Sequence, residues 1–351
     1  MKYRAFRWST LALALALGAP DTADAAMPAP TTITPELVKA ATAEGKVVFY
    51  TSVELKLGED LAKLFQEKYP GISVQVERTG SERVFQRIGQ EYAASIHTVD
   101  VVNSSDAAHF LYWKEHGMLA PFLSAEMATE YPANAIDPDG TYGSWRVTLS
   151  PFAYNTKLVK EGEAPKSFAD LLDPKWKGRL VKASPNYSGT IMTSTYETLQ
   201  ALGGWDFFEK LAKQDVLQTQ SATEPPRKVA TGERDVMVDG SEYFVYALID
   251  QGNPLKIVYP AEGVPMITSP AAIMKEAPHP NAARLFYAFI FSAPVQQYMV
   301  EKGGTRSLDK EVKDRPDHVP LASLKLWPED PKAMEAKAEE IKKKYRQLFG
   351  G

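Results

Sequence analysis

The chain has 351 residues, 44% of them hydrophobic, and it contains no cysteine. A chain of this length can bury one or two hydrophobic cores, and without thiols it forms neither disulfides nor thiolate metal sites. The formal net charge of −4 argues against a nucleic-acid partner, because neutralising the phosphates requires a basic surface.

The first 25 residues have the pattern of a cleavable secretion signal. Three basic residues within the first seven precede an alternating Leu/Ala segment from Leu11 to Ala19, and Ala23-Asp24-Ala25 supplies a small-x-small cleavage pattern. As a helix, the apolar segment would span roughly 13 Å, far less than a bilayer core of about 30 Å. We therefore expect a signal peptide over 1–25 and export to the periplasm as a soluble protein.

The elements expected in the first third alternate between helix and strand. Thr34-Pro35-Glu36 combines an N-cap, a proline at the first helical position and an acid in the first turn, and Gly45 ends this helix. Next come a strand at 46–50, a helix at 57–65, a strand at 72–76, a helix from Ser81, a strand at 99–102, and a helix that Ser104 and Ser105 cap and Gly117 ends. Such alternation predicts parallel strands with right-handed crossovers.

A second unit of the same kind follows. Strands are expected at 149–155, 180–183, 236–238 and 255–259, helices at 191–202, 205–213 and 242–251, and then a return strand near 273–274 and a helix at 282–291. Residues 332–346 alternate acids and bases at helical spacing, which predicts a solvated terminal helix. The fold class is therefore α/β, with two doubly wound lobes and a ligand cleft between them.

No catalytic motif stands out. The sequence has no G-x-S-x-G elbow and no G-x-x-x-x-G-K-[ST] phosphate loop, and Ser307-Leu-Asp-Lys310 fits S-x-x-K without a matching K-T-G. None of the five histidines has the i, i+4 partner of a helical zinc site. We therefore expect neither an enzyme nor a cofactor. A secreted hydrolase is the alternative from another class, and it would need a nucleophile–base pair.

Short hydroxyl residues recur where strands end and helices begin. The predicted ligand-binding residues are Ser52, Ser81, Ser104, Ser188, Gly189, Thr190, Arg227, Ser241 and Tyr243. Because helix N-termini offer free N–H groups and a partial positive charge, a cleft ringed by them suits an anion. Each hydroxyl could instead be only an N-cap. Arg227 and Tyr243 would add a charged donor and a phenol, although a surface arginine and a half-buried tyrosine explain them equally well.

The segment Ser167-Phe-Ala-Asp-Leu-Leu-Asp-Pro-Lys-Trp-Lys-Gly-Arg-Leu180 carries a family resemblance. Locally, Ser167 and Asp170 form an S-x-x-D cap, and Asp173-Pro174 ends the short helix. The segment closely resembles one found in the periplasmic solute-binding proteins of ABC importers, type II, ferric-iron and related-anion branch. The other matching segments, in order, are Tyr50-Thr-Ser52, Tyr154-Asn155, Thr231-Gly-Glu233, Pro260-Ala-Glu-Gly263 and Pro278-His-Pro-Asn-Ala-Ala-Arg-Leu-Phe286.

The resemblance covers residue 46 to about residue 300. It implies two lobes joined by a strand hinge, which close over one ligand and then dock on a membrane permease that works with an ATPase. We expect an N-terminal lobe of 26–148 with 268–320, a C-terminal lobe of 149–267 with 321–351, and a monomer.

The residues that would bind the ligand differ from those of the iron-binding relatives. These typically present two adjacent tyrosines where this chain has Ser241-Glu-Tyr-Phe244, and Phe244 has no oxygen to give a ferric ion. A histidine that some relatives carry after the first strand is replaced by Val53-Glu54-Leu55. We therefore expect a small organic anion (a carboxylate, phosphonate or phosphate ester) and no metal. The alternative is a ferric-ion carrier that uses Tyr243, Tyr246 and Glu54.

Overall fold

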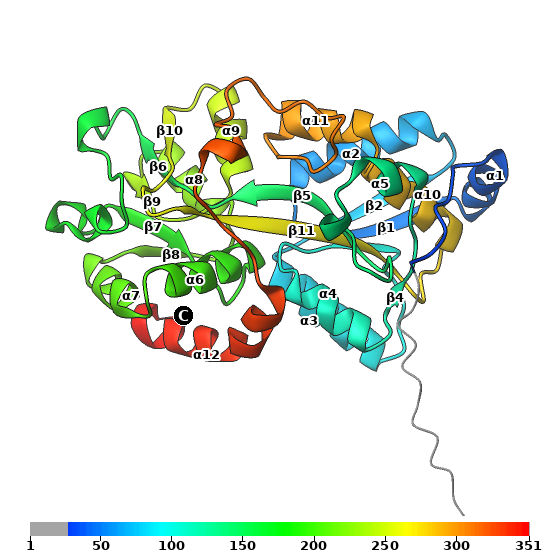
Figure 1. Ribbon diagram of the computed structural model, residues 1–351, viewed down its shortest axis with the longest axis horizontal. Coiled ribbons are helices and arrows are strands. Elements are labelled where there is room, and N and C mark those ends of the chain that lie inside the picture. Colours follow the sequence, from blue (N-terminus) through cyan, green and yellow to red (C-terminus); the bar gives the residue numbers. More distant parts are fainter. Residues whose placement is uncertain (1–26, 351) are drawn as a thin grey trace, which may run out of the picture.

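The computed structural model describes residues 27–350, so the predicted signal peptide lies outside the described residues. Two α/β lobes lie side by side, and two long strands run from one lobe into the other (Figure 1). The predicted fold class, two α/β lobes of the type II periplasmic binding proteins, is confirmed. In residues 27–350, no helix is both long enough and apolar enough to cross a membrane.

The first lobe contains a seven-stranded sheet. Its strands are β1 (Lys46–Thr51), β2 (Ser73–Arg78), β3 (Val101–Asn103), β4 (Leu119–Ala120), β5 (Gly143–Leu149), β11 (Val264–Met274) and β12 (Leu326–Trp327). Its helices are α1 (Pro35–Glu44), α2 (Leu55–Lys68), α3 (Ser81–Ala93), α4 (Ala108–Glu115), α5 (Ala125–Glu130), α10 (Pro280–Ile290) and α11 (Ala293–Gly303). The main strand order is β12-β11-β3-β1-β2. β1 pairs in parallel with β2 and β3, as expected, whereas β11 runs antiparallel to β3.

The second lobe contains a five-stranded sheet in the order β10-β6-β9-β7-β8. These strands are β6 (Phe152–Asn155), β7 (Leu180–Ala183), β8 (Leu217–Thr219), β9 (Val236–Met237) and β10 (Leu255–Val258). The helices are α6 (Gly189–Ala201), α7 (Asp206–Leu211), α8 (Glu224–Ala230), α9 (Glu242–Asp250) and α12 (Pro331–Phe349). Short 3₁₀ helices cover 133–135, 161–163, 170–172, 174–176, 212–214 and 321–323 of the chain. β7 is parallel to β8 and β9, and β6 is antiparallel to its neighbours.

Several details of the sequence prediction are wrong, and α5, α11, β4, β8 and β12 were not predicted. The expected strand at 149–155 is two strands, β5 and β6, because the chain turns at Ser150-Pro151, where proline has no N–H for a ladder. Neither Ser104 nor Ser105 caps α4: its N-cap position is Ala107, and Asp106 just before it accepts from the N–H of Ala108 at 3.0 Å. Helix α8 was missed because it opens with two prolines, which the first turn of a helix tolerates.

The two lobes are joined through β5 and β11. These strands are antiparallel partners from Leu149 opposite Met266 to Gly143 opposite Ala271, and a bulge lies between Ser269 and Pro270. A third connection runs from the end of α11 back to the second lobe and into α12 (Figure 1). The lobes therefore move relative to each other only by bending these segments.

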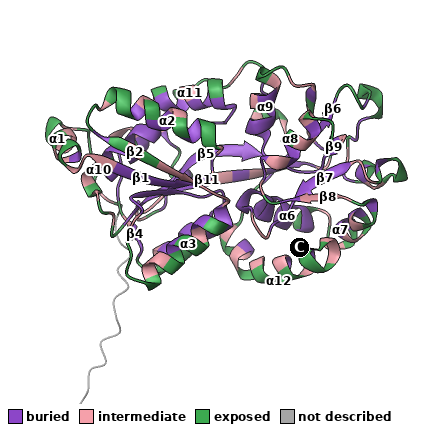
Figure 2. Cartoon of the chain, turned by 180° about the vertical axis from the view of Figure 1, so that it is seen from behind, coloured by how far each residue is buried: buried purple, intermediate pink, exposed green. Residues whose placement is uncertain are grey.

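Each lobe has its own core, and Figure 2 shows buried residues along both sheets. In the first lobe, Phe286 packs edge-on against Phe49 at 5.2 Å and Phe65 at 5.1 Å between ring centroids. In the second lobe, α12 buries Met334 and Ile341 against the sheet core, so one face of the predicted solvated helix is packed. The exact lobe boundaries stay a prediction.

Candidate functional site

A small cavity lies between the two lobes, at the ends of strands of both sheets. We call it the inter-lobe cavity. Its lining residues are Ser52, Arg78, Gly80, Ser81, Ser105, Arg146, Ser188, Thr190, Ser221, Ala222, Thr223, Ser241 and Tyr243. Eight of them carry an aliphatic hydroxyl, two are arginines and none is acidic. Its volume is about 10 Å³, which is room for about one water molecule, so the lobes are closed on each other.

Six of the nine predicted site residues line this cavity: Ser52, Ser81, Ser188, Thr190, Ser241 and Tyr243. Ser104 lies behind it, where its hydroxyl accepts from the N–H of Asp106 and bonds to Nδ1 of His109. Gly189 lies between two lining residues and contacts the opposite lobe. The ligand-binding role of these residues stays a prediction, but their gathering at one place follows from the expected topology, because parallel strands end at the same sheet edge.

Sequence reasoning missed the two arginines of the cavity. Arg146 is the only charged residue of β5, whose seven residues are all buried, and a charge within a buried strand is the signal that could have found it. Arg78 ends β2 next to Thr79-Gly80, where nothing in the sequence distinguishes it from a surface arginine.

The Arg146 guanidinium is buried without a counterion. The residue is 1% exposed, its Nε and Nη1 have no hydrogen-bond partner, and among residues 27–350 no carboxylate forms an ion pair with it. Its Cζ lies 5.0 Å from the centre of the Tyr243 ring. Burial lowers the pKa of Arg146, and Tyr243 offsets only part of this shift. A buried cation of this kind is costly unless an anion joins it.

Two more residues, Arg78 and Ser52, have hydrogen-bond donors at the cavity. Arg78 donates through Nε to the carbonyl of Val53 at 3.1 Å and through Nη2 to the hydroxyl of Ser221 at 3.2 Å, but no carboxylate in the described chain neutralises it. The hydroxyl of Ser52 is shielded from solvent and has no partner. The cavity is therefore positively charged and has spare donor capacity.

The N-terminus of α6 closes the cavity from the second lobe. The N–H of Gly189 donates to the Ser81 hydroxyl at 2.5 Å, and the N–H of Thr190 donates to the Ser105 hydroxyl at 3.2 Å. These N–H groups were expected to be free for the ligand, and in the closed structure hydroxyls of the first lobe occupy them. A Cβ on Gly189 would lie 2.4 Å from the Cβ of Asp106, so the approach requires glycine.

A buried ionic cluster supports this closure. Lys342 of α12 pairs with Glu82 of the first lobe at 2.8 Å, and Nε2 of His109 lies 3.3 Å from Glu82 and 3.7 Å from Asp106. Burial lowers the pKa of His109, but the two carboxylates outweigh it and raise the pKa. Glu82, Asp106 and His109 have ligand atoms within 4.8 Å of one another. Lys342 and the protonated His109 already balance the two carboxylates, so we interpret the cluster as an ion-pair network.

A larger pocket of about 550 Å³, which we call the vestibule, adjoins the cavity and shares Tyr243 with it. Arg227 lies here and not in the inter-lobe cavity, and its ligand-binding role stays a prediction. Its side chain is 53% exposed and forms an ion pair with Glu54 across the cleft at 3.1 Å. The Tyr243 hydroxyl accepts from the N–H of Glu54 at 3.1 Å. These contacts separate the cavity from the vestibule.

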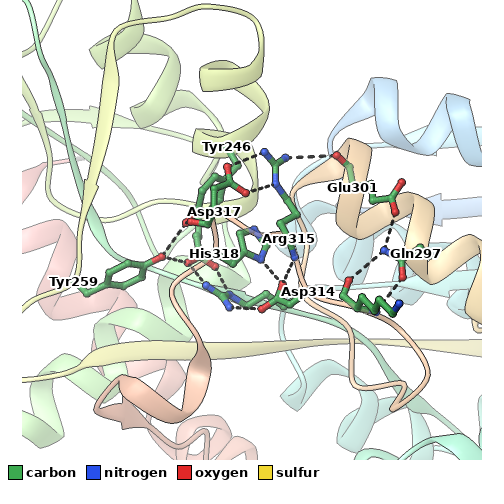
Figure 3. A network of polar contacts seen from close by, with 11 residues as sticks. Tyr246, Tyr259, Gln297, Glu301, Asp314, Arg315, Asp317 and His318 are labelled. Atoms are coloured by element: carbon green, nitrogen blue, oxygen red, sulfur yellow. Dashed lines mark hydrogen bonds and ion pairs between the residues drawn. The ribbon is translucent and has the colours of Figure 1, made fainter.

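The alternative iron ligands do not meet in one place. Tyr246 points instead into the network of Figure 3, where its hydroxyl lies 3.3 Å from the Tyr259 hydroxyl and 3.3 Å from the carbonyl of Asp317. The carboxylate of Glu54 accepts hydrogen bonds from Arg227 and from the N–H of Leu57. Burial raises the pKa of Tyr243, which opposes the tyrosinate that a ferric ion needs.

The comparisons with known proteins identify the class. The sequence profile of the bacterial extracellular solute-binding proteins matches residues 51–297, and the chain belongs to this family. The predicted resemblance to solute-binding proteins of ABC importers is therefore confirmed. The fold matches AfuA of Actinobacillus pleuropneumoniae, a periplasmic binding protein solved with fructose 6-phosphate, with a TM-score of 0.79 and 26% identity over 87% of this chain and 98% of that one.

Relatives named for iron also match. The structure of iron-bound HitA from Pseudomonas aeruginosa has a TM-score of 0.73 at 22% identity and covers 86% of this chain and 99% of that one. Iron uptake protein A1 of Synechocystis is 25% identical over 252 residues, which are 66% of this chain and 67% of that protein. The family therefore defines the class, and the residues of the site must decide the ligand.

Proposed function

We propose that the protein is a periplasmic, monomeric solute-binding subunit that captures a phosphate ester, or a phosphonate or carboxylate of similar size, and delivers it to an ABC permease and its ATPase, without catalysis of its own. The observation that carries the ligand assignment is the buried guanidinium of Arg146, which has no counterion among the described residues.

The physical argument is one of charge compensation. Removing a cation from water costs several kcal/mol unless a partner compensates. An anion in the cavity would pair with Arg146 and Arg78 and accept from the surrounding hydroxyls, and hydrogen bonds to a charged group are the stronger kind. A ligand with several anionic oxygens, such as a phosphate or phosphonate, uses this set of donors best.

The lobe contacts explain how binding drives closure. Ser52 and Ser81 come from the first lobe, and Ser188 and Ser241 come from the second. A ligand that bonds to both sets stabilises the closed state over the open one. Because the closed cavity has room for about one water molecule, the lobes separate slightly when an anion is bound.

The relatives point to two classes of ligand, sugar phosphates and ferric iron, and the residues of the site favour the first. AfuA was solved with a sugar phosphate, and an arginine-lined, acid-free cavity suits such a ligand. For ferric iron, the site offers a single cavity tyrosine whose pKa burial raises, and Tyr246 lies elsewhere. We therefore rank iron second.

Calorimetry on the purified protein tests the proposal, with fructose 6-phosphate, inorganic phosphate, fructose and ferric citrate as probes. We expect the phosphate ester to bind and fructose not to bind. Arg146→Met should weaken phosphate-ester binding by about 100-fold, because charged hydrogen bonds worth about 1.5–3 kcal/mol each are lost. The melting temperature of the empty protein should not fall.

The matched control is Arg284→Met, which changes an exposed arginine of α10 and should bind like the parent. Equal binding by Arg146→Met and the parent would show that the buried guanidinium is not the anion site. Stoichiometric ferric binding without phosphate-ester binding would establish the iron alternative instead.

A further inference from the structure

A pair of carboxylates lies beside α6, outside the lining of the inter-lobe cavity. Glu197 belongs to α6 and is 3% exposed. Neither of its carboxylate oxygens has a partner in hydrogen-bond geometry, and the nearby N–H of Met266 on β11 only partly offsets the rise of its pKa. Glu329 lies between β12 and α12. Its Oε1 accepts from the hydroxyl of Thr193 at 3.4 Å, and Thr193 precedes Glu197 by one helical turn, so both acids lie over the same face of α6.

The hinge strand β11 also contacts this pair of carboxylates. Oε2 of Glu329 accepts from the N–H of Thr268 at 3.2 Å and from the Thr268 hydroxyl, and Thr268 belongs to β11, the long strand that joins the lobes. One oxygen-rich site therefore connects α6, the hinge strand and the segment that leads into α12.

Nothing cationic neutralises the two acids. Within residues 27–350, neither Glu197 nor Glu329 forms an ion pair, and the next charged group that acts on Glu329 is a third carboxylate, Asp106. The phenols of Tyr142 and Tyr196 and the carboxylate of Asp330 are further titratable groups nearby, and both phenols are neutral at physiological pH. Two buried carboxylates without a cationic partner must hold either protons or a cation.

The pKa values show how strongly the site resists a double negative charge. Burial, and then the charge of Glu329, raises the pKa of Glu197 to about 10. Burial raises the pKa of Glu329 to about 8, against the hydrogen bonds from Thr268. Without a cation, the site therefore keeps protons at neutral pH.

We propose that Glu197 and Glu329, with the hydroxyls of Thr193 and Thr268, form a binding site for a hard divalent cation of the calcium type. The available ligand atoms are all oxygens, which hard cations prefer, and the unpartnered carboxylate of Glu197 can bind in bidentate fashion. A bound cation would cross-link α6 to the hinge strand and displace the protons. This site is independent of the anion cavity.

The experiment measures the melting temperature of the full protein after EDTA treatment and dialysis, with and without Ca²⁺, at pH 6 and pH 8. We expect Ca²⁺ to raise the melting temperature, and to raise it more at pH 8, because fewer protons then compete for the carboxylates. Mg²⁺ at equal concentration should act more weakly, because it demands a more regular geometry.

Glu197→Gln should abolish the Ca²⁺ response and lower the calorimetric affinity for Ca²⁺ by at least about 100-fold, because a direct ligand matters more than an outer-shell residue. The variant should fold, because it replaces a buried acid by a neutral amide of the same shape. Glu340→Gln, an exposed change on α12, is the matched control and should respond like the parent.

Two results would overturn the proposal. The first is the absence of a Ca²⁺ response at pH 8 in the parent, which would mean that protons alone neutralise the acids. The second is an equal response in the parent and in Glu197→Gln, which would place the cation elsewhere on the protein.

Discussion

The N–H of Gly189 donates to the hydroxyl of Ser81 at 2.5 Å, and the two residues belong to different lobes. An α-helix leaves its first N–H groups without partners inside the helix. Here a hydroxyl of the first lobe supplies the missing acceptor for a helix of the second lobe. The end of α6 is thus a clamp between the lobes, and an anion that bound there would have to replace Ser81 and Ser105 as acceptors.

The first prediction concerns this clamp. Gly189→Ala should prevent full closure, because its Cβ would lie 2.4 Å from the Cβ of Asp106 and 2.8 Å from the Asp106 backbone nitrogen. The variant should fold, because the clash with Asp106 lies between the two lobes and not inside the core of either. We expect small-angle scattering to show a larger radius of gyration for the ligand-free variant than for the ligand-free parent, whereas binding of fructose 6-phosphate should change less, because the lobes are already slightly apart when an anion is bound.

Gly89→Ala is the matched control, because nothing lies within 4 Å of a Cβ at this helical position. It should bind like the parent and be slightly more stable, since alanine favours a helix more than glycine does. If the ligand-free Gly189→Ala protein were as compact as the ligand-free parent, the close approach of α6 to Asp106 would be wrong.

The second prediction concerns the ion pair between Lys342 and Glu82. Burial raises the pKa of Glu82, but His109 and Lys342 outweigh it and lower the value to about 2. A lowered pKa contributes stability above the ordinary value of 4.5, and this contribution is lost as the pH falls from there towards 2. Lys342→Met should therefore lower the melting temperature at pH 7, and the difference from the parent should shrink over that interval.

The control for this prediction is Lys343→Met, the neighbouring residue on α12, for which no ion pair is found in the described chain. If the difference in melting temperature between Lys342→Met and the parent stayed constant as the pH fell from 7 towards 2, the lysine would contribute by packing and not by pairing with Glu82.

The sequence predicted those features that depend on local chemistry. The cap at Thr34 accepts from the N–H of Leu37 at 3.2 Å, and Gly45 ends α1 with φ of +70°. Ser167 and Asp170 cap each other reciprocally, at 3.1 and 3.0 Å. In the site, the hydroxyls were found because they follow strands and open helices, and these positions are readable from the pattern.

The missed features depend on contacts between distant segments. Arg146 becomes a site residue only because β5 joins both lobes, and Lys342 meets Glu82 across 260 residues of chain. That Arg227 faces the vestibule could not be predicted, because its place in the chain does not reveal which side of the cleft a long side chain takes. No local pattern encodes such tertiary placement.

The third prediction concerns the buried ion pair of Arg306 and Glu242. Arg306 follows α11, and it donates through Nε and Nη2 to the Glu242 carboxylate at 2.9 and 3.0 Å. Next to it, Arg315 donates to Asp250 of α9 at 2.8 Å, and the Tyr246 hydroxyl of α9 donates to the carbonyl of Asp317 (Figure 3). Arg306→Met should destabilise the protein by about 3–5 kcal/mol, because it leaves a buried carboxylate unpaired.

The double variant Arg306→Met/Glu242→Gln should recover most of that loss in denaturant unfolding, because both charges are then removed. Because Glu242 lies between Ser241 and Tyr243, the single variant should also weaken ligand binding. A double variant as unstable as the single one would show that Arg306 acts through its packing alone.

The fourth prediction concerns processing, and it falls on residues outside the described part of the chain. Because Ala23-Asp24-Ala25 has the small-x-small pattern, the secreted protein should begin at Ala26 or within a residue or two of it. The intact mass of protein isolated from the periplasm measures this directly. An unprocessed chain in the cytosol would contradict the proposed location.

The last prediction separates the two ligand classes at Tyr243. Ferric citrate should produce no strong visible charge-transfer band, because burial raises the pKa of this phenol and Phe244 offers no second oxygen. Tyr243→Phe should keep fructose 6-phosphate binding within about ten-fold of the parent, since it removes one neutral hydrogen bond, to the N–H of Glu54, worth about 0.5–1.5 kcal/mol. A coloured stoichiometric ferric complex that disappears in Tyr243→Phe would instead establish an iron carrier, and the unpaired charge of Arg146 would then need another explanation.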